Sequence, residues 1–108
     1  MSIETVLGEL KGVGAETLEA QATDNGLTAG VYAPTGIESN IICISVVDAG
    51  SILFVVQDDA DASPADASNG VVLTNTDGPF FIACDPSKVL FRRVGGSDIT
   101  INVHYFVG

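Results

Sequence analysis

The chain alternates between short hydrophobic runs and turns made of Gly, Pro, Asn, Asp and Ser, a pattern typical of β-strands. The runs are rich in β-branched and aromatic residues, which favour strands. The pattern predicts eight strands, at residues 17–23, 27–33, 41–47, 52–57, 71–75, 80–83, 89–94 and 99–106. Turn signals at this close spacing are typical of antiparallel sandwiches and small barrels. We therefore expect a mainly β fold, an antiparallel β-sandwich of jelly-roll type.

The last predicted strand has the clearest alternation. Its two sets of side chains are Ile99, Ile101, Val103 and Tyr105 on one face, and Thr100, Asn102, His104 and Phe106 on the other. Alternate residues of a strand point to opposite faces of the sheet. The second set indicates a partly exposed sheet face. Earlier in the chain, Asp24-Asn25-Gly26 separates two predicted strands and is typical of a hairpin turn.

The N-terminus follows a helical pattern instead. An apolar stripe recurs at the spacing of one helix face, formed by Ile3, Val6, Leu7 and Leu10. Ser2 is a suitable N-cap, and Lys11 followed by Gly12 is a natural end. So short a helix must pack on something, either its own domain or a neighbouring subunit. We expect a helix or arm at residues 1–15 and a sandwich domain at residues 16–108.

Composition and charge limit the function. The chain has 108 residues, the length of one domain, and 46% of them are hydrophobic. Fourteen acidic residues against four basic ones give a net charge of −10, which repels phosphate backbones and anionic lipid heads. We expect neither nucleic-acid nor membrane binding. The first ten residues do not follow the pattern of a signal peptide, so we expect synthesis in the cytoplasm without export.

Cofactor and metal sites are not expected. Cys43 and Cys84 both lie in apolar runs and are interpreted as buried, reduced thiols. The acidic stretch at residues 58–70 offers closely spaced oxygen ligands, but Pro64 and Gly70 stand where a calcium loop needs Gly and an acid. We interpret this stretch as a solvated loop.

No catalytic site is expected either. His104 is the only histidine, and the sequence shows no nucleophile or triad motif to accompany it. We interpret it as a surface or interface residue. Arg92 and Arg93 point to opposite faces of their strand, and in so acidic a chain the default expectation is an ion pair within the molecule. An ion pair between subunits is the alternative.

Phe80-Phe81 is the most suggestive apolar feature. The chain has no Trp, the usual platform for sugars, and most of its aromatic residues fall at core positions. Phe80 and Phe81 are adjacent on a strand, so one of the two must face outward. The expected partner interface consists of Ile3, Val6, Leu7, Leu10, Phe80 and Phe81.

Residues 85–103, DPSKVLFRRVGGSDITINV, resemble the closing strands of small capsid decoration (cement) proteins of tailed bacteriophages. The resemblance is one of style and covers the last third of the chain. It implies a virion protein on the capsid surface, bound across neighbouring subunits of the major capsid protein. A homo-oligomer, dimer or trimer, fits that role. The alternative is a tail or host-surface adhesin, or a carbohydrate-binding β-sandwich module.

Overall fold

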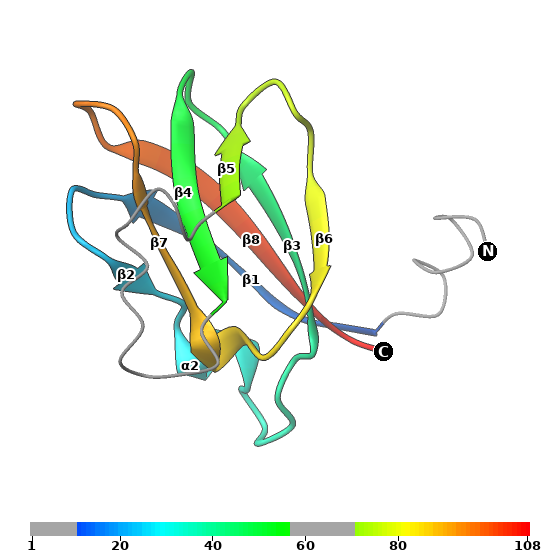
Figure 1. Ribbon diagram of the computed structural model, residues 1–108. Coiled ribbons are helices and arrows are strands. Elements are labelled where there is room, and N and C mark those ends of the chain that lie inside the picture. Colours follow the sequence, from blue (N-terminus) through cyan, green and yellow to red (C-terminus); the bar gives the residue numbers. More distant parts are fainter. Residues whose placement is uncertain (1–10, 57–70) are drawn as a thin grey trace.

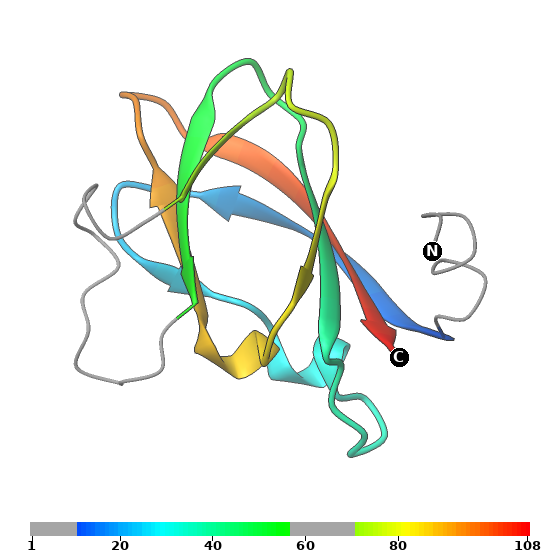
Figure 2. The same ribbon diagram turned by 45° about the vertical axis from the view of Figure 1, so that its right-hand side comes forward.

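A computed structural model describes residues 11–56 and 71–108. These residues form two four-stranded antiparallel sheets that pack face to face as a sandwich (Figures 1 and 2). The expected mainly β, two-sheet antiparallel fold is therefore confirmed. The jelly-roll form of that expectation stays a prediction. Within the described residues no helix is long and apolar enough to cross a membrane.

Strands from distant parts of the chain lie side by side in each sheet. The first sheet contains, in spatial order, β1 (Lys11–Ala20), β8 (Ile99–Val107), β3 (Ile41–Val46) and β6 (Phe80–Ala83). The second contains β2 (Asn25–Gly26), β7 (Val89–Arg93), β4 (Ser51–Val56) and β5 (Val71–Thr74). Two short helical segments complete the described chain, α2 (Ala29–Tyr32) and the 3-10 turn η1 (Pro86–Lys88).

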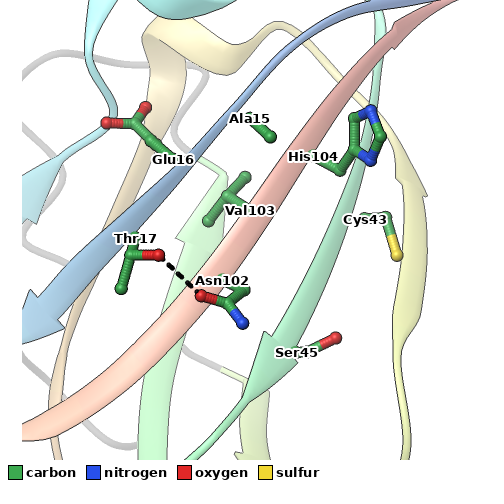
Figure 3. Close-up of a pocket in the computed structure, with 8 residues that line it drawn as sticks. All are labelled: Ala15, Glu16, Thr17, Cys43, Ser45, Asn102, Val103 and His104. Carbon is green, nitrogen blue, oxygen red and sulfur yellow. Dashed lines mark hydrogen bonds between the residues drawn. The ribbon is translucent and has the colours of Figure 1, made fainter.

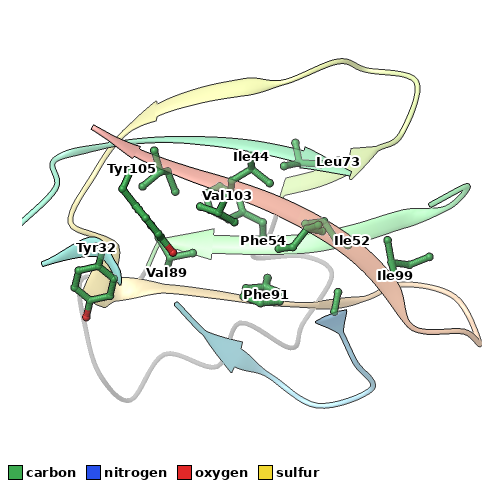
Figure 4. Close-up of a cluster of buried hydrophobic side chains, with 13 residues drawn as sticks. Tyr32, Ile44, Ile52, Phe54, Leu73, Val89, Phe91, Ile99, Val103 and Tyr105 are labelled. Carbon is green, nitrogen blue, oxygen red and sulfur yellow. The ribbon is translucent and has the colours of Figure 1, made fainter. Parts of the chain in front are cut away.

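The hydrophobic core lies between the two sheets (Figure 4). Its side chains come from the inward faces of both, and the largest that are fully buried include Tyr105, Phe91, Ile42, Ile44, Ile52 and Leu73. The alternation predicted for β8 is confirmed. Ile99, Ile101, Val103 and Tyr105 are buried, whereas Asn102 and His104 are exposed.

The predicted hairpin around Asp24-Asn25-Gly26 is wrong. Asn25 and Gly26 form β2, which pairs with β7, while β1 pairs with β8 in the other sheet. Most of the expected strand at residues 27–33 is the helix α2. Its apolar residues cover the end of the core, where the rings of Tyr32 and Tyr105 meet edge to face at 5.8 Å. A short apolar run can serve a helix or a strand equally well, so periodicity could not separate them.

Strand β1 begins earlier than expected. Residues 11–15, assigned to the N-terminal arm, pair with β8, from Lys11 opposite Val107 to Ala15 opposite His104. The register shifts between Gly12 and Gly14. A side chain at Gly14 would approach the carbonyl oxygen of Val31 to 2.6 Å, so glycine lets α2 pack closely on the strand. The Lys11-Gly12 pair is thus part of a strand and not a helix end.

Two expectations fall outside the described residues. The first is the N-terminal helix with its stripe of Ile3, Val6, Leu7 and Leu10. The second is the acidic loop at residues 58–70.

Candidate functional site

The outer face of the sheet β1-β8-β3-β6 is the strongest candidate site. Residues directly opposite each other on neighbouring strands lie on the same side of a sheet. The register therefore groups one set of outward side chains: Ala15, Thr17, Glu19, Ile41, Cys43, Ser45, Phe81, Ala83, Thr100, Asn102, His104 and Phe106. Only Glu19, which lies opposite Thr100 on the edge strand β1, is Asp, Glu, Lys or Arg, in a chain with fourteen acidic residues. We call this surface, apart from Glu19 at its border, the uncharged face.

Three aromatic rings form the apolar half of the uncharged face. His104 and Phe106 are two residues apart on β8, and their rings stack at 4.4 Å between centroids. The Phe81 ring reaches Phe106 from β6, with centroids 6.2 Å apart. Phe81 is 38% exposed, so the cluster is open to solvent. A large exposed aromatic group of this kind is typical of a surface that contacts a partner.

Polar, uncharged groups form the other half. Thr17 donates a hydrogen bond from Oγ1 to Oδ1 of Asn102, at 2.8 Å, which joins β1 to β8. Ser45 lies opposite Asn102 on β3. Together with His104 and Cys43, these residues line an open groove of about 620 Å³ (Figure 3). The groove can offer hydroxyl, amide and imidazole groups to a ligand, and Glu16 is the one charged residue in its lining.

The groove also contains a cysteine next to a histidine. Cys43 and His104 are opposite each other in the register of β3 and β8. Burial raises the pKa of the Cys43 thiol. A catalytic cysteine needs the opposite shift, because the thiolate is the nucleophile. This pair is therefore suited to packing, and the pKa of Cys84, raised by burial to about 11, shows the same tendency.

A second group of polar residues lies beside η1. Glu38 and Asp85 are linked through their carboxyl groups, and this hydrogen bond raises the pKa of Glu38 and lowers that of Asp85. Asp85 also accepts hydrogen bonds from the backbone N–H and the hydroxyl of Ser87, at 3.0 and 2.7 Å. The described part of the chain contains no cluster of three or more potential metal ligands. Asp85 therefore caps η1.

The expected interface residues are only partly brought together. Phe80 packs against the core and Phe81 faces outward, which confirms that one of the pair is exposed. The role of Phe81 in binding stays a prediction, and the four N-terminal residues Ile3, Val6, Leu7 and Leu10 lie outside the described residues. Sequence reasoning did not select Phe106, Cys43 or Thr17. Alternation could identify each as outward, but nothing in the sequence told which strands are neighbours.

The two arginines make ion pairs within the molecule, as expected by default. Arg93 binds Asp98 at 2.6 Å across the turn between β7 and β8. Arg92 lies 3.7 Å from Asp24 and donates a hydrogen bond to the carbonyl oxygen of Ala22 at 2.7 Å. The arginines therefore hold the loop after β1 and the turn after β7 against the sandwich.

Both thiols are free, as expected, although each is half-buried and not fully buried. His104 is exposed, in agreement with its interpretation as a surface residue. Comparisons of the chain with protein-family models, with curated proteins and with solved structures gave no match.

Proposed function

We propose that this chain is a structural virion protein that decorates and stabilises a phage capsid by binding across neighbouring capsid subunits. In this proposal it has no catalytic role and needs no cofactor or metal. It is made in the host cytoplasm, acts on the capsid surface and contacts the major capsid protein through the uncharged face.

One observation carries the proposal: the uncharged face has three clustered rings, and the only charged side chain among the paired outward residues of its sheet is Glu19, at the border. If its acidic residues were placed at random, a chain with a net charge of −10 would have carboxylates on every exposed surface. The central part of a protein–protein interface is depleted of charged residues and enriched in aromatic ones. The uncharged face has both properties, which supports its use as a contact surface.

The strand order supports the jelly-roll form of the fold. The orders β1-β8-β3-β6 and β2-β7-β4-β5 combine strands from both ends of the chain in each sheet. Eight strands in two sheets built from Greek keys define a jelly roll, an architecture found in viral capsid proteins and in lectins. Fold alone does not assign a function. It is compatible with a capsid role and with the alternative below.

The resemblance of residues 85–103 to the closing strands of capsid decoration proteins favours the capsid role. That segment holds η1, β7 and the start of β8, so it joins both sheets. A decoration protein engages several identical subunits at once, and weak contacts then add through multivalency. An apolar and polar surface with no charge at its centre, which binds moderately at each site, is suited to such a task.

The test is binding to particles that lack the protein. Purified chain is mixed with such particles, and co-sedimentation and the heat resistance of the capsid are measured. The variant His104→Glu puts a charge at the centre of the uncharged face and should weaken binding at least tenfold. The matched variant Val94→Glu changes a 56% exposed valine in the turn after β7 and should bind like the wild type. Wild-type chain that does not bind the particles, or equal binding by both variants, would contradict the proposal.

A carbohydrate-binding module, such as a tail or host-surface adhesin, is the second candidate. The groove beside Thr17, Ser45 and Asn102 favours it, because hydroxyl and amide groups next to exposed rings are suited to sugar hydroxyls. Phe81 and Phe106 would have to replace the missing Trp as the stacking platform. Binding to a glycan array that is lost in Asn102→Ala, without retention on particles, would establish this alternative.

A further inference from the structure

Strand β6 forms one edge of the sheet β1-β8-β3-β6, and its free side can be assigned residue by residue. The N–H of Cys84 binds the carbonyl oxygen of Asn40 at 3.0 Å, just beyond the pair Ile41–Ala83. In an antiparallel ladder this makes Ile82 a hydrogen-bonded partner of Ile42. The N–H and C=O groups of Phe81 and Ala83 therefore point away from β3, towards the open edge.

The side chains of β6 that face the core are incompletely covered. Phe80 and Ile82 are half-buried, whereas Ile42 and Ile44 on the neighbouring strand are at most 1% exposed. Phe81 adds an exposed ring on the outer side. A further strand would therefore pair the backbone N–H and C=O groups of Phe81 and Ala83, and it would bury more of the β6 side chains.

The other three edges differ. β1 has Lys11, Glu16 and Glu19 along its length, and charges on an edge discourage strand addition. β2 is only two residues long. β5 also lacks charge and has two exposed valines, Val71 at 56% and Val72 at 50%, but it has no aromatic ring. Of the described edges, β6 alone combines an exposed aromatic ring with the absence of charged residues.

We propose that β6 pairs with β6 of a second copy of this chain, antiparallel and across a two-fold axis at Ile82. In this register Phe81 lies opposite the partner's Ala83, and Ala83 lies opposite the partner's Phe81. The free N–H and C=O groups of both residues are then satisfied, giving four hydrogen bonds between the chains. The two sheets join into one continuous eight-stranded sheet.

The side chains fit this register. The small Ala83 leaves room for the partner's Phe81 ring on the outer side, and the reverse contact is identical by symmetry. The register with Phe81 opposite the partner's Phe81 would instead bring Pro79 opposite the partner's Ala83. Proline lacks the N–H that a ladder needs, so that register loses hydrogen bonds. The sequence of β6 thus selects a self-complementary pairing.

Charge gives the pairing a distinctive salt dependence. β6 has no charged residue, while each chain has a net charge of −10. The two chains repel each other at long range, and salt screens that repulsion. Raising the sodium chloride concentration should therefore tighten the dimer. A contact made of ion pairs would respond in the opposite direction.

The first experiment measures oligomeric state by sedimentation equilibrium on the full chain, without any particle present. The wild type should be a dimer whose dissociation constant falls as salt rises. Ala83→Glu should lower the affinity at least a hundredfold and give a monomer. Ala15→Glu is the matched control, because Ala15 is an exposed alanine on the same sheet face but on the opposite edge strand, β1. It should remain a dimer.

The second experiment tests the register by disulfide cross-linking, with Cys43 and Cys84 replaced by Ser. Directly opposite residues of an antiparallel pair have Cα atoms about 4.5–5.5 Å apart, within the range of a disulfide. Phe81→Cys chains mixed with Ala83→Cys chains should cross-link to each other, whereas each variant alone should not. A wild-type monomer at all concentrations, a dimer lost equally in Ala15→Glu, or cross-linking of Phe81→Cys alone would overturn the proposal. Because no particle is involved, these results are independent of the capsid role.

Discussion

The two faces of the sheet β1-β8-β3-β6 are built from the same strands but have opposite character. The inner face contributes buried residues such as Ile44 and Tyr105, and stability depends on it. The outer face alternates with it along each strand and has rings, hydroxyls and an amide, and its only charged residue among the paired positions is Glu19, at the border. Burial explains the inner residues completely. It does not explain the uncharged outer residues, so a contact with a partner is the better explanation for these.

The largest expected effect is on the free energy of unfolding, which should depend on the inner face and hardly on the outer face. Ile44→Ala removes a 1% exposed side chain from the core and should lower the free energy of unfolding by about 2–5 kcal/mol. Its neighbour Ser45 points outward, so Ser45→Ala should change stability by no more than about 0.5 kcal/mol. Urea unfolding followed by circular dichroism measures both. Equal losses in the two variants would mean that the outer face is also packed as a core.

A smaller effect is expected for Tyr105, whose phenol is buried on the inner face of this sheet. The hydroxyl of Tyr105 donates a hydrogen bond to Oε2 of Glu16 at 2.5 Å, and burial raises the pKa of Tyr105 far above its usual value, so the phenol stays protonated. Tyr105→Phe should cost about 1.5 kcal/mol, since half-buried Glu16 keeps its bond from the N–H of Thr28 and can be hydrated. Urea unfolding measures this cost. Tyr32→Phe keeps the ring contact with Tyr105 and is the control; an equal cost there would contradict the assignment.

The end of the sheet should show a small, pH-dependent effect. Asp48 accepts a hydrogen bond from the backbone N–H of Thr100 at 2.9 Å, and this bond lowers the pKa of the carboxyl group. The folded chain then binds the Asp48 proton less tightly than the unfolded chain. The stabilisation is present above the usual pKa of 3.8 and is lost as pH falls through the lower, folded-state value.

The comparison between wild type and Asp48→Asn measures this directly in thermal melts. The wild type should be more stable at neutral pH, and the difference should disappear in acid. A difference that stays constant over the whole pH range would show that the charge of Asp48 has no part in it.

The smallest effect concerns reactivity and leaves stability unchanged. Burial raises the pKa of Cys43 and raises that of Cys84 to about 11, so little thiolate forms at mildly alkaline pH. Alkylation by iodoacetamide should be slow at both residues in the folded chain and fast after unfolding, as followed by mass spectrometry. Fast labelling of Cys43 in the folded chain would indicate that the groove is more open than described.

The sequence was sufficient to predict most of the strands but not their neighbours. Alternation identified the buried and outward residues of β8, and it correctly required that one of Phe80 and Phe81 face outward. The uncharged face depends on β1, β8, β3 and β6 lying together, which joins residues almost a whole chain length apart. Local patterns contain no information on such pairings, because the register forms only when the sheets pack on each other.

The N-terminal half of the chain was harder to interpret for a different reason. The apolar run at residues 27–33 was expected to be a strand because its composition favours one, yet α2 forms there and covers the end of the core. Lys11-Gly12 could serve as a helix end, but pairing with β8 draws both residues into β1. In each case a tertiary contact decided between two conformations that the local sequence allows.

The central claim, that the uncharged face is the contact surface, can be tested through the only histidine in the chain. His104 is exposed at the middle of that face, and diethyl pyrocarbonate modifies accessible neutral imidazole groups. Mass spectrometry compares its modification in the free chain with that in chain bound to particles. We predict rapid modification of the free chain and strong protection in the bound chain. Equal modification of His104 in both states, with binding intact, would contradict the account.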